Sequence, residues 1–304
     1  MPTIRKAVIP AAGLGTRLFP LTRALPKEML PVGGQPVIEH TIRELVASGI
    51  EEITVVISGN KGLIQEHFAP DDQLVEQLRS VGKSDLADAV SDLSELGARL
   101  NFVYQRGPYG NGTPILTAAS WSAGSTEPFL ALWADDVFVS ERPRAQQLIE
   151  AHEATGAPVI ALMPMRREES IRYGVPIVES ALGDGRLRIR GLVEKPKPED
   201  APSLYAAIGG YIITPEIVDE LAERTRRWQE LRDGEIYLTD ALHAHAVKHT
   251  LVGQLLEGTW YDTGNHLSYL KAQFAAALAD PAYGPELRRL VHDLDPAGQD
   301  ESNT

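Results

Sequence analysis

Glycines and basic residues cluster near the N-terminus of this 304-residue chain, directly after an apolar run. The run Ala7–Ile9 has the composition of a buried strand and leads to Gly13, Gly15 and Arg17, with Lys27 ten positions further on. Two glycines separated by one residue let the backbone turn tightly and direct several N–H groups into one hollow, which can hold phosphate. An arginine fork and a lysine charge beside such a hollow suit a triphosphate better than a single phosphate.

The spacing of these glycines excludes two common nucleotide-binding loops. The dinucleotide fingerprint needs a third glycine three residues after Gly15, where this chain has Leu18, and the stretch contains no GKS or GKT of a Walker loop. Pro20, Pro26 and Pro31 interrupt any helix here and favour a shaped loop. On their own, the glycines favour an ordinary strand-to-helix turn with basic residues nearby by chance.

A pair of acids follows another apolar run. Asp135 and Asp136 come directly after Leu130–Ala134, which reads as a buried strand. Acids at the end of such a strand are costly unless they are paired or bind a metal. Their oxygens suit Mg²⁺, which is usually held by one or two carboxylates and by phosphate oxygens. An isolated pair of this kind is equally compatible with a turn whose acids face water.

Two further strand ends carry polar side chains. Gln105 precedes a glycine-rich loop, and its amide can read the edge of a base because it offers both a donor and an acceptor. Glu194 and Lys195 end another apolar run, and an adjacent pair of this type is usually a surface ion pair that adds little stability.

The full stretch from Lys6 to Pro36 is more specific than its glycines. AAGLGTR followed by PKEMLPVGGQPVIEH resembles the signature of the sugar-1-phosphate nucleotidylyltransferases, and is most similar to the bacterial UTP–glucose-1-phosphate uridylyltransferases among them. So many matching positions across about thirty residues are hard to reach by chance. The resemblance extends over residues 5–280.

The resemblance implies a role for each matching residue. The family holds its metal with the aspartates of an ADD-type and a WxDTG-type motif, which correspond to Asp135 and Asp262 and imply Mg²⁺ as cofactor. In the VEKP motif, Glu194 would accept sugar hydroxyls and Lys195 would hold the sugar phosphate, with Gly174 against the sugar. The expected catalytic residues are Arg17, Lys27 and Lys195, and the expected nucleotide-binding residues are Ala11, Ala12, Gly13, Gly15, Thr16, Gln105, Gly110 and Gly112.

The chain departs from the family pattern at several positions. The loop that usually reads GLGHA is GNGTP here, with Thr113 and Pro114 at the histidine and alanine positions. Near the sugar-facing strand, Leu204 and Gly210 replace an asparagine and an arginine, and these changes could reshape the sugar pocket. The role of Asp136 is left open.

The implied reaction is nucleotidyl transfer between UTP and a sugar-1-phosphate, with glucose-1-phosphate as the expected acceptor. An oxygen of the sugar phosphate attacks the α-phosphorus in line and pyrophosphate leaves, so the protein must align and neutralise two polyanions but needs no nucleophile of its own. One alternative is a thymidylyltransferase or an enzyme for another sugar-1-phosphate. The other is a non-catalytic nucleotide-sugar binding protein, which would be expected to lack one of the acids or bases that this chain keeps.

Composition narrows the possible partners. The chain is 43% hydrophobic and 23% charged, which is ordinary for a globular protein, and its net charge is −13. An acidic surface repels nucleic acid and anionic membranes, so neither is expected as a partner. The lack of cysteine excludes disulfides and thiolate chemistry. With no apolar signal region and no run of membrane-spanning length, we expect a cytoplasmic protein, and by analogy with the family a homo-oligomer.

Strand-like and helix-like segments alternate along the first half of the chain. This order predicts an α/β fold with a Rossmann-like, mixed but mostly parallel sheet flanked by helices, as in nucleotide-diphospho-sugar transferases. Ligands in such sheets bind outside the carboxyl ends of the strands. The expected strands are 6–12, 53–59, 101–105, 128–133, 158–165 and 206–213, and the expected helices include 36–48 and 267–278.

We expect one catalytic domain over residues 1–280. A polar helical insertion at 70–97 resembles one in the bacterial uridylyltransferases that the shorter thymidylyltransferases lack. Residues 281–304 are expected to form a C-terminal tail, and the composition from Asp295 onward is typical of disorder.

One further helix is expected after Gly234, and its start offers two capping candidates, Thr239 and Asp240. On that helix, His243 and His245 are two residues apart and therefore point to different sides. They show no metal-ligand spacing, and we expect them on the surface.

Overall fold

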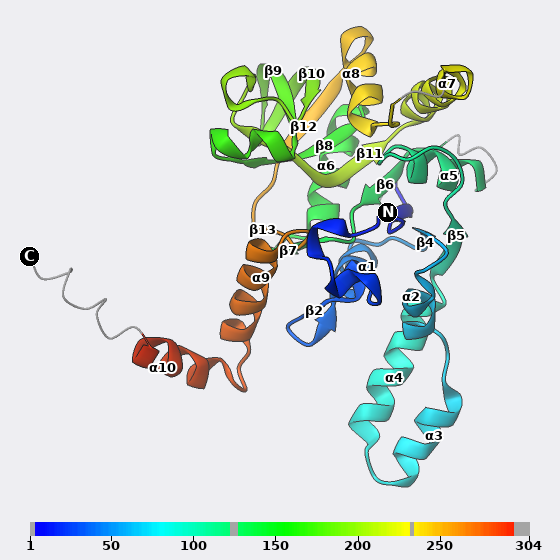
Figure 1. Cartoon of the computed structure of the whole chain (residues 1–304), viewed down its shortest axis with the longest axis vertical. Coiled ribbons are helices and arrows are strands. Elements are labelled where there is room, and N and C mark those ends of the chain that lie inside the picture. The colour runs from blue at the N-terminus through cyan, green and yellow to red at the C-terminus, as the bar shows by residue number, and fades with distance from the viewer. Residues whose placement is uncertain (1–3, 122–126, 232–233, 295–304) are drawn as a thin grey trace, which may run out of the picture.

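The computed structural model describes residues 4–121, 127–231 and 234–294, so the disorder expected from Asp295 onward lies outside the described residues. Figure 1 shows a central sheet with helices packed on it, a helical hairpin that projects from one end, and a C-terminal helix that lies away from the sheet. Within these described ranges, no helix is both long enough and apolar enough to cross a membrane.

The described strands form one nine-stranded sheet in the order β5-β4-β1-β6-β11-β8-β12-β10-β9, together with two small ladders, β7–β13 and β2–β3. Only β10 and β11 run against the others in the large sheet, which confirms a mixed, mostly parallel arrangement. The strands are β1 (Lys6–Pro10), β2 (Pro31–Val32), β3 (Gln35–Pro36), β4 (Glu52–Ile57), β5 (Leu100–Tyr104), β6 (Phe129–Leu132), β7 (Asp136–Val139), β8 (Val159–Pro164), β9 (Gly174–Gly183), β10 (Arg186–Glu194), β11 (Tyr205–Ile213), β12 (Leu251–Leu255) and β13 (Thr259–Asp262).

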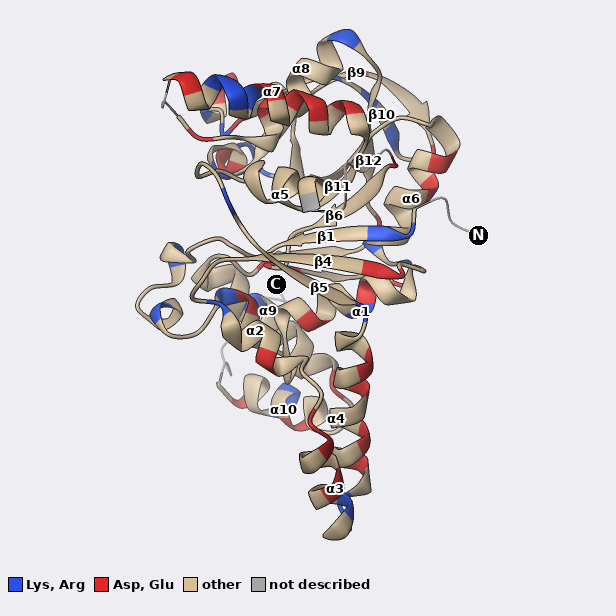
Figure 2. Cartoon of the chain, turned by 90° about the vertical axis from the view of Figure 1, so that its right-hand side faces the viewer, with Lys and Arg blue, Asp and Glu red and all other residues tan. Residues whose placement is uncertain are grey.

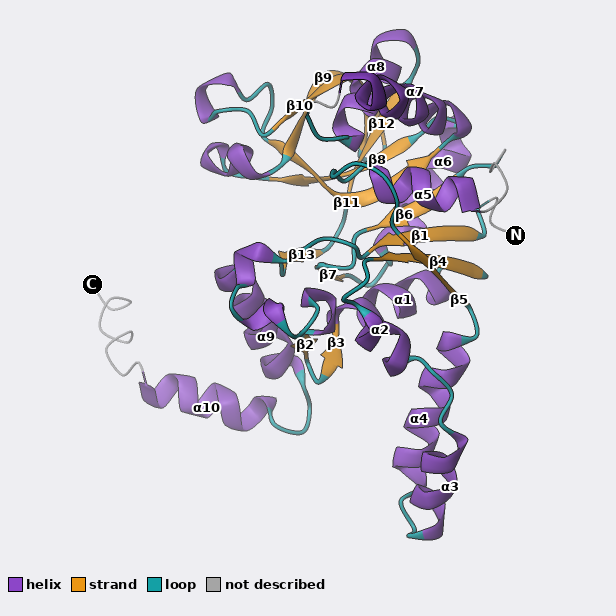
Figure 3. Ribbon diagram, turned by 45° about the vertical axis from the view of Figure 1, so that its right-hand side comes forward, coloured by secondary structure: helices purple, strands orange, loops and turns teal. Residues whose placement is uncertain are grey.

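Helices cover both faces of the sheet (Figure 3). Side chains of α1 and α6 share one core cluster with Ile9 and Val55, whereas those of α5, α7 and α8 share the other with Val8 and Val56. Successive residues of a strand point to opposite faces, so β1 and β4 supply both clusters. The helices are α1 (Val37–Ala47), α2 (Gly62–His67), α3 (Asp72–Ser80), α4 (Ser84–Gly97), α5 (Thr113–Trp121), α6 (Arg144–Thr155), α7 (Pro215–Leu231), α8 (Leu238–Lys248), α9 (His266–Ala279) and α10 (Gly284–Leu294), with 3₁₀ turns at Thr16–Leu18, Leu21–Arg23, Lys27–Met29, Arg167–Arg172 and Pro198–Asp200.

Residues 70–97 form the projecting hairpin of α3 and α4, and Figure 2 shows acidic residues along it. Asp71 caps α3 because its side chain accepts a hydrogen bond from the backbone N–H of Leu74. Ala87 and Leu96 are the buried residues of α4, and none of α3 is buried. Within the expected tail, residues 284–294 form helix α10.

The start of α8 differs from the expectation. The helix begins at Leu238, and neither Thr239 nor Asp240 caps it. Instead, the side-chain oxygen of Asn111 accepts a hydrogen bond from the backbone N–H of Leu238 at 2.8 Å. A residue 127 positions away thus satisfies this N–H group, which leaves the hydroxyl of Thr239 free to bind elsewhere.

The expected surface position of the histidines on α8 is wrong. His245 is 4% exposed, and His243 is half-buried with its Nδ1 2.9 Å from the carbonyl oxygen of Leu192. Helix α8 packs against α7 and against β10, so two of its sides are covered. Burial lowers the pKa of His245 below its ordinary value, because the charged ring would lose its hydration.

Candidate active site

A cavity of about 520 Å³ opens at the ends of the central strands, and eleven of the fifteen residues expected to bind substrate or metal line it. Its wall is assembled from the N-terminal loop, the segment after β5, the end of β6, and β9, β10, β11 and β13. The eleven residues are Ala12, Gly13, Arg17, Lys27, Gln105, Gly110, Asp135, Gly174, Glu194, Lys195 and Asp262. The other four, Ala11, Gly15, Thr16 and Gly112, do not line it.

Two of these four residues, Ala11 and Gly15, fix the conformation of the N-terminal loop without lining the cavity. Ala11 is buried, and its N–H donates to the carbonyl oxygen of Val56 at 2.8 Å, so the loop leaves β1 still fixed to β4. Gly15 has φ +67, and the hydroxyl of Thr22 donates to its carbonyl oxygen at 2.8 Å. A side chain at Gly15 would be strained in this left-handed conformation and would press on Thr22 at 3.3 Å.

Lys27 and Asp135 form an ion pair on the cavity wall. Their Nζ and Oδ2 atoms are 2.5 Å apart, and both side chains are less than 20% exposed. Burial alone would lower the pKa of Lys27, but the charges of Asp135 and Glu28 outweigh it and raise that pKa above the usual value. Burial likewise would raise the pKa of Asp135, but the Lys27 charge holds it below the usual range. Both groups are therefore ionised at neutral pH.

The paired strands β7 and β13 bring the second acid to the same place. Asp262 lies opposite Asp136 in this ladder, and both the N–H and the hydroxyl of Thr263 donate to the carbonyl oxygen of Asp135, at 2.9 and 2.7 Å. These bonds fix the end of β13 against the end of β6. As a result, two acids that are far apart in the sequence face one part of the cavity.

Two arginines and one tyrosine hydroxyl lie around the Asp262 carboxylate. Its Oδ2 accepts hydrogen bonds from Arg172 Nη2 and from the Tyr173 hydroxyl, each at 3.2 Å, and Arg17 Nη1 lies 4.0 Å away. The sequence singled out Tyr173 only as the neighbour of Gly174, and it gave no sign that Arg172 would enter the site. Only the fold shows that this turn points into the cavity.

The two aspartates fit a divalent cation that takes further ligands from substrate. A Cβ placed on Gly264 would lie 3.0 Å from Asp262 Oδ1 and 3.1 Å from Asp135 Oδ2, so both carboxylates approach one point beside a glycine. Among the residues that the structure describes, no group of three or more His, Cys, Asp or Glu side chains could hold a metal ion. Two hard oxygen donors suit Mg²⁺, which commonly keeps phosphate oxygens and waters in its shell.

Asp136, whose role the sequence left open, lines the same cavity but is bound by other groups. Its Oδ1 accepts from the indole N–H of Trp260 at 2.7 Å, its Oδ2 accepts from the N–H of Gly209 at 3.0 Å, and Arg144 Nη1 lies 3.7 Å away. Burial first, and then the charge of Asp135, raise the pKa of Asp136 to about 7. These bonds tie β7, β11 and β13 together, so Asp136 supports the shape of the site.

A second group of contacts forms the other end of the cavity. Glu194 Oε2 accepts a hydrogen bond from the Thr239 hydroxyl at 2.6 Å, and Glu194 Oε1 lies 3.2 Å from Lys195 Nζ. Lys195 has φ +47, an uncommon conformation for a residue other than glycine, and its ammonium sits 5.6 Å from the centre of the Tyr237 ring. Thr239 and Tyr237 also line the cavity, although the sequence suggested only structural support for their segment.

The segment after β5 closes the remaining side. The backbone N–H of Gln105 donates to the carbonyl oxygen of Ile57 at 2.8 Å, and the residue lines the cavity. Gly110 has φ +137, and a Cβ there would lie 2.3 Å from the carbonyl oxygen of Ile236. A Cβ on Gly112 would lie 2.7 Å from Leu221. Both glycines permit close packing of this segment against its neighbours.

Two of the departures from the family pattern lie away from the cavity. Leu204 does not line it. Gly210 faces helix α6, because a Cβ there would meet Leu148 at 3.0 Å and Arg144 at 3.4 Å. Pro114, in contrast, does line the cavity.

Fold and site together define a nucleotidyltransferase. The family model described as nucleotidyl transferase matches residues 6–277, and this chain belongs to that family. The chain is 39% identical over 295 residues to a UTP–glucose-1-phosphate uridylyltransferase of Staphylococcus epidermidis, covering 97% of this chain and 100% of that protein. It is 36% identical to the UTP–glucose-1-phosphate uridylyltransferase YngB of Bacillus subtilis, covering 96% and 95%.

Solved structures show the same likeness. A UTP-bound UGPase from Acinetobacter baumannii matches with a TM-score of 0.84 at 30% identity, over 96% of this chain and 99% of that one. A UDP-glucose pyrophosphorylase in complex with UDP-glucose matches with a TM-score of 0.76 at 31% identity, over 90% and 98%. These matches confirm the fold class and the family expected from the sequence.

Proposed function

We propose that this enzyme transfers a uridylyl group from UTP to glucose-1-phosphate, giving UDP-glucose and pyrophosphate, with Mg²⁺ as cofactor. The observation that carries the proposal is one cavity whose wall holds the cations of Arg17, Lys27 and Lys195 together with the facing carboxylates of Asp135 and Asp262. The near full-length similarity to proteins named UTP–glucose-1-phosphate uridylyltransferase supports the choice of both substrates.

Transfer requires the acceptor phosphate and the triphosphate to approach one another despite their charges. The cations of the cavity meet this requirement at two places, because Arg17 and Lys27 lie on the N-terminal loop and Lys195 lies beyond the end of β10. We assign Arg17 and Lys27 to the triphosphate and Lys195 to the sugar phosphate. Such fixed charges stabilise the transition state without having to reorient during the reaction.

Mg²⁺ held by Asp135 and Asp262 would neutralise phosphate charge where the bond to the leaving group breaks. Lys27 keeps Asp135 ionised and fixed, since its ammonium already contacts one carboxylate oxygen. Arg172 and Tyr173 fix Asp262 in the same way. Both acids are therefore positioned as ligands by residues of the chain itself.

The sugar and the base are read at opposite parts of the wall. Glu194 is oriented by the Thr239 hydroxyl and can accept hydrogen bonds from sugar hydroxyls, with Gly174 leaving room beside it. The amide of Gln105 can pair with uracil. Cytoplasmic location and homo-oligomeric state stay predictions.

The test is a reaction of the purified chain with UTP, glucose-1-phosphate and Mg²⁺. We expect UDP-glucose and pyrophosphate to form in equal amounts, and both products can be identified by chromatography and by ³¹P NMR. A panel of nucleoside triphosphates and sugar-1-phosphates then ranks the alternatives. Faster turnover with ATP or GTP, or no turnover with any pair, would overturn the proposal.

A further inference from the structure

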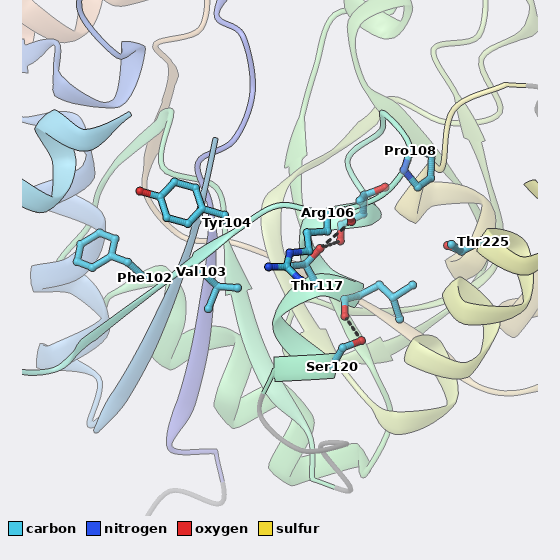
Figure 4. Close-up of a pocket in the computed structure, with 10 residues that line it drawn as sticks. Phe102, Val103, Tyr104, Arg106, Pro108, Thr117, Ser120 and Thr225 are labelled. Carbon is cyan, nitrogen blue, oxygen red and sulfur yellow. Dashed lines mark hydrogen bonds between the residues drawn. The ribbon is translucent and has the colours of Figure 1, made fainter. Parts of the chain in front are cut away.

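A second cavity of about 510 Å³ lies beside the segment that follows β5, and Figure 4 shows the residues that line it. Its walls come from β5, from the segment that follows it, from α5 and from α7. It is as large as the active-site cavity, and no residue lines both. The proposed reaction leaves this second cavity without a role.

The segment between β5 and α5 separates the two cavities. Arg106 and Thr113 line the second cavity, whereas their chain neighbours Gln105 and Pro114 line the active-site cavity. The same short segment therefore supplies wall residues to both cavities. Thr113 and Pro114 are also the two positions at which the chain departs from the GLGHA-like pattern.

The lining of the second cavity indicates what it could hold. Of the residues that line it in the described structure, Arg106 alone is charged, and its side chain is exposed. Val103 and Leu116 provide an apolar surface beside it, because Val103 pairs with Val56 on the face of the sheet that α5 covers. The hydroxyl of Thr113 is buried at this wall and, within the described part of the chain, has no hydrogen-bond partner. A buried hydroxyl without a partner is costly, so a polar group of a ligand could satisfy it.

Neighbouring hydroxyls of the cavity are already engaged. Thr117 donates to the carbonyl oxygens of Thr113 and Arg106, at 2.9 and 3.3 Å, and Ser120 donates to that of Leu116 at 2.8 Å (Figure 4). Thr117 thus ties the Arg106 backbone to α5, and the Arg106 guanidinium and the Thr113 hydroxyl remain as the groups that a ligand could bind.

We propose that the second cavity is a regulatory site for a small organic anion that carries a flat apolar ring. Its ring would lie on the apolar wall and its anionic group would pair with Arg106. Occupancy changes the affinity for UTP by shifting the segment that carries Gln105, and by linkage UTP changes the affinity for the anion. The coupling between the anion and UTP rests on the proposed function, whereas the binding of the anion does not.

The binding test uses 8-anilinonaphthalene-1-sulfonate, an aromatic sulfonate whose fluorescence rises in apolar surroundings. It is titrated into the wild-type chain, into Arg106→Gln, and into Ser120→Trp, which places a ring at an exposed position of the cavity wall. Arg99→Gln is the matched control, because it removes the same charge from an exposed position just before β5 and outside the cavity.

The expected result is one saturable site in the wild type and in Arg99→Gln. Arg106→Gln should raise the dissociation constant about tenfold, as expected for loss of a charged hydrogen bond, and Ser120→Trp should abolish the saturable signal. Wild-type affinity in both cavity variants would place the anion elsewhere and overturn the proposal. A change of association state in Ser120→Trp, measured by sedimentation, would also overturn it, because the cavity would then be a contact between subunits.

The coupling is measured separately, as the KM for UTP with and without saturating anion. It should change in the wild type and stay constant in Ser120→Trp. An unchanged wild-type KM would overturn the regulatory role. If the chain does not turn over UTP at all, the proposed function fails while the binding result stands, so the two failures are distinguishable.

Discussion

An ion pair behind the active-site cavity and one on the α3–α4 hairpin differ sharply in their exposure to water. Behind the cavity, Lys61 Nζ lies 2.7 Å from both carboxylate oxygens of Glu28, and these side chains are 4% and 1% exposed. On the hairpin, Arg79 lies 3.3 Å from Asp88, with side chains 58% and 70% exposed. A desolvated charge depends strongly on its partner, whereas an exposed charge has water instead.

The difference shows how the fold holds its reactive charges in place. Glu28 is the neighbour of Lys27 in one 3₁₀ turn, so the buried pair with Lys61 fixes the turn that presents Lys27 to Asp135. Arg144 has no exposed surface and acts similarly from the other side, between Glu44 and Asp136. The Arg79–Asp88 pair joins only the two helices of the hairpin and fixes no residue of the cavity.

The largest expected difference between these regions is in stability. Glu28→Gln leaves the Lys61 ammonium buried without its counter-charge, and we expect the free energy of unfolding to fall by about 3–5 kcal/mol. Arg79→Gln on the hairpin should change it by less than about 0.5 kcal/mol. Urea unfolding of both variants measures this contrast, and equal losses would contradict the distinction between the two regions.

Within the cavity, the two ends should respond differently to loss of charge. Lys195→Ala should mainly raise the KM for glucose-1-phosphate, because the lost ammonium faces that phosphate, and Arg17→Ala should mainly impair use of the triphosphate. Each loss should be about 10–100-fold in kcat/KM for the affected substrate. Steady-state kinetics with each substrate varied in turn separates them. The same defect in both variants, confined to UTP, would remove the division of labour.

Base choice should give a smaller effect. Uracil and thymine share the face that an amide can read and differ by one methyl group, which a pocket discriminates by about 1–3 kcal/mol. We therefore expect UTP to be preferred, dTTP to be used detectably, and CTP and purine triphosphates to be poor substrates. Gln105→Ala should lower the ratio of kcat/KM for UTP over CTP more than it lowers the maximal rate. An unchanged ratio would remove Gln105 from the base site.

The smallest expected effect lies outside the cavity, at His245 on α8. Its pKa is lower in the folded chain than in the unfolded one, so below about pH 6.5 the unfolded state binds more protons and stability falls as pH falls. His245→Gln should flatten this slope, by at most about 1.4 kcal/mol per pH unit. His266→Gln, at an exposed position, is the matched control. Identical urea midpoints across pH 5–7 in wild type and His245→Gln would contradict the prediction.

Residues that belong to local patterns were predictable from the sequence, and residues defined by distant partners were not. The six expected strands follow from apolar runs, and each agrees with the structure to within two residues at either end. Gly13 and Lys195 lie in motifs that resemble a known family, so their places were predictable too. Recognising Arg172 as part of the site required knowing that β13 returns to the end of β6.

Burial set by tertiary packing was equally out of reach. The surface expectation for His245 rested on its spacing from His243, and only the packing of α8 on β10 and α7 explains its 4% exposure. The capping of α8 by Asn111 depends on a contact across 127 positions. Gly210 was expected to affect the sugar pocket because its strand lies beside it, but alternation along the strand turns it toward α6.

The most direct test of the account concerns Asp135 and Asp262, which should act together on one reacting centre. The measurement is kcat for Asp135→Asn, Asp262→Asn and the double variant, with thermal unfolding to verify that each is folded. We expect each single substitution to lower kcat by about 10²–10³ or more. The kcat of the double variant should equal that of the less active single variant, because the two acids serve one function. Near-normal turnover in either single variant, or losses that multiply in the double variant, would contradict a shared site.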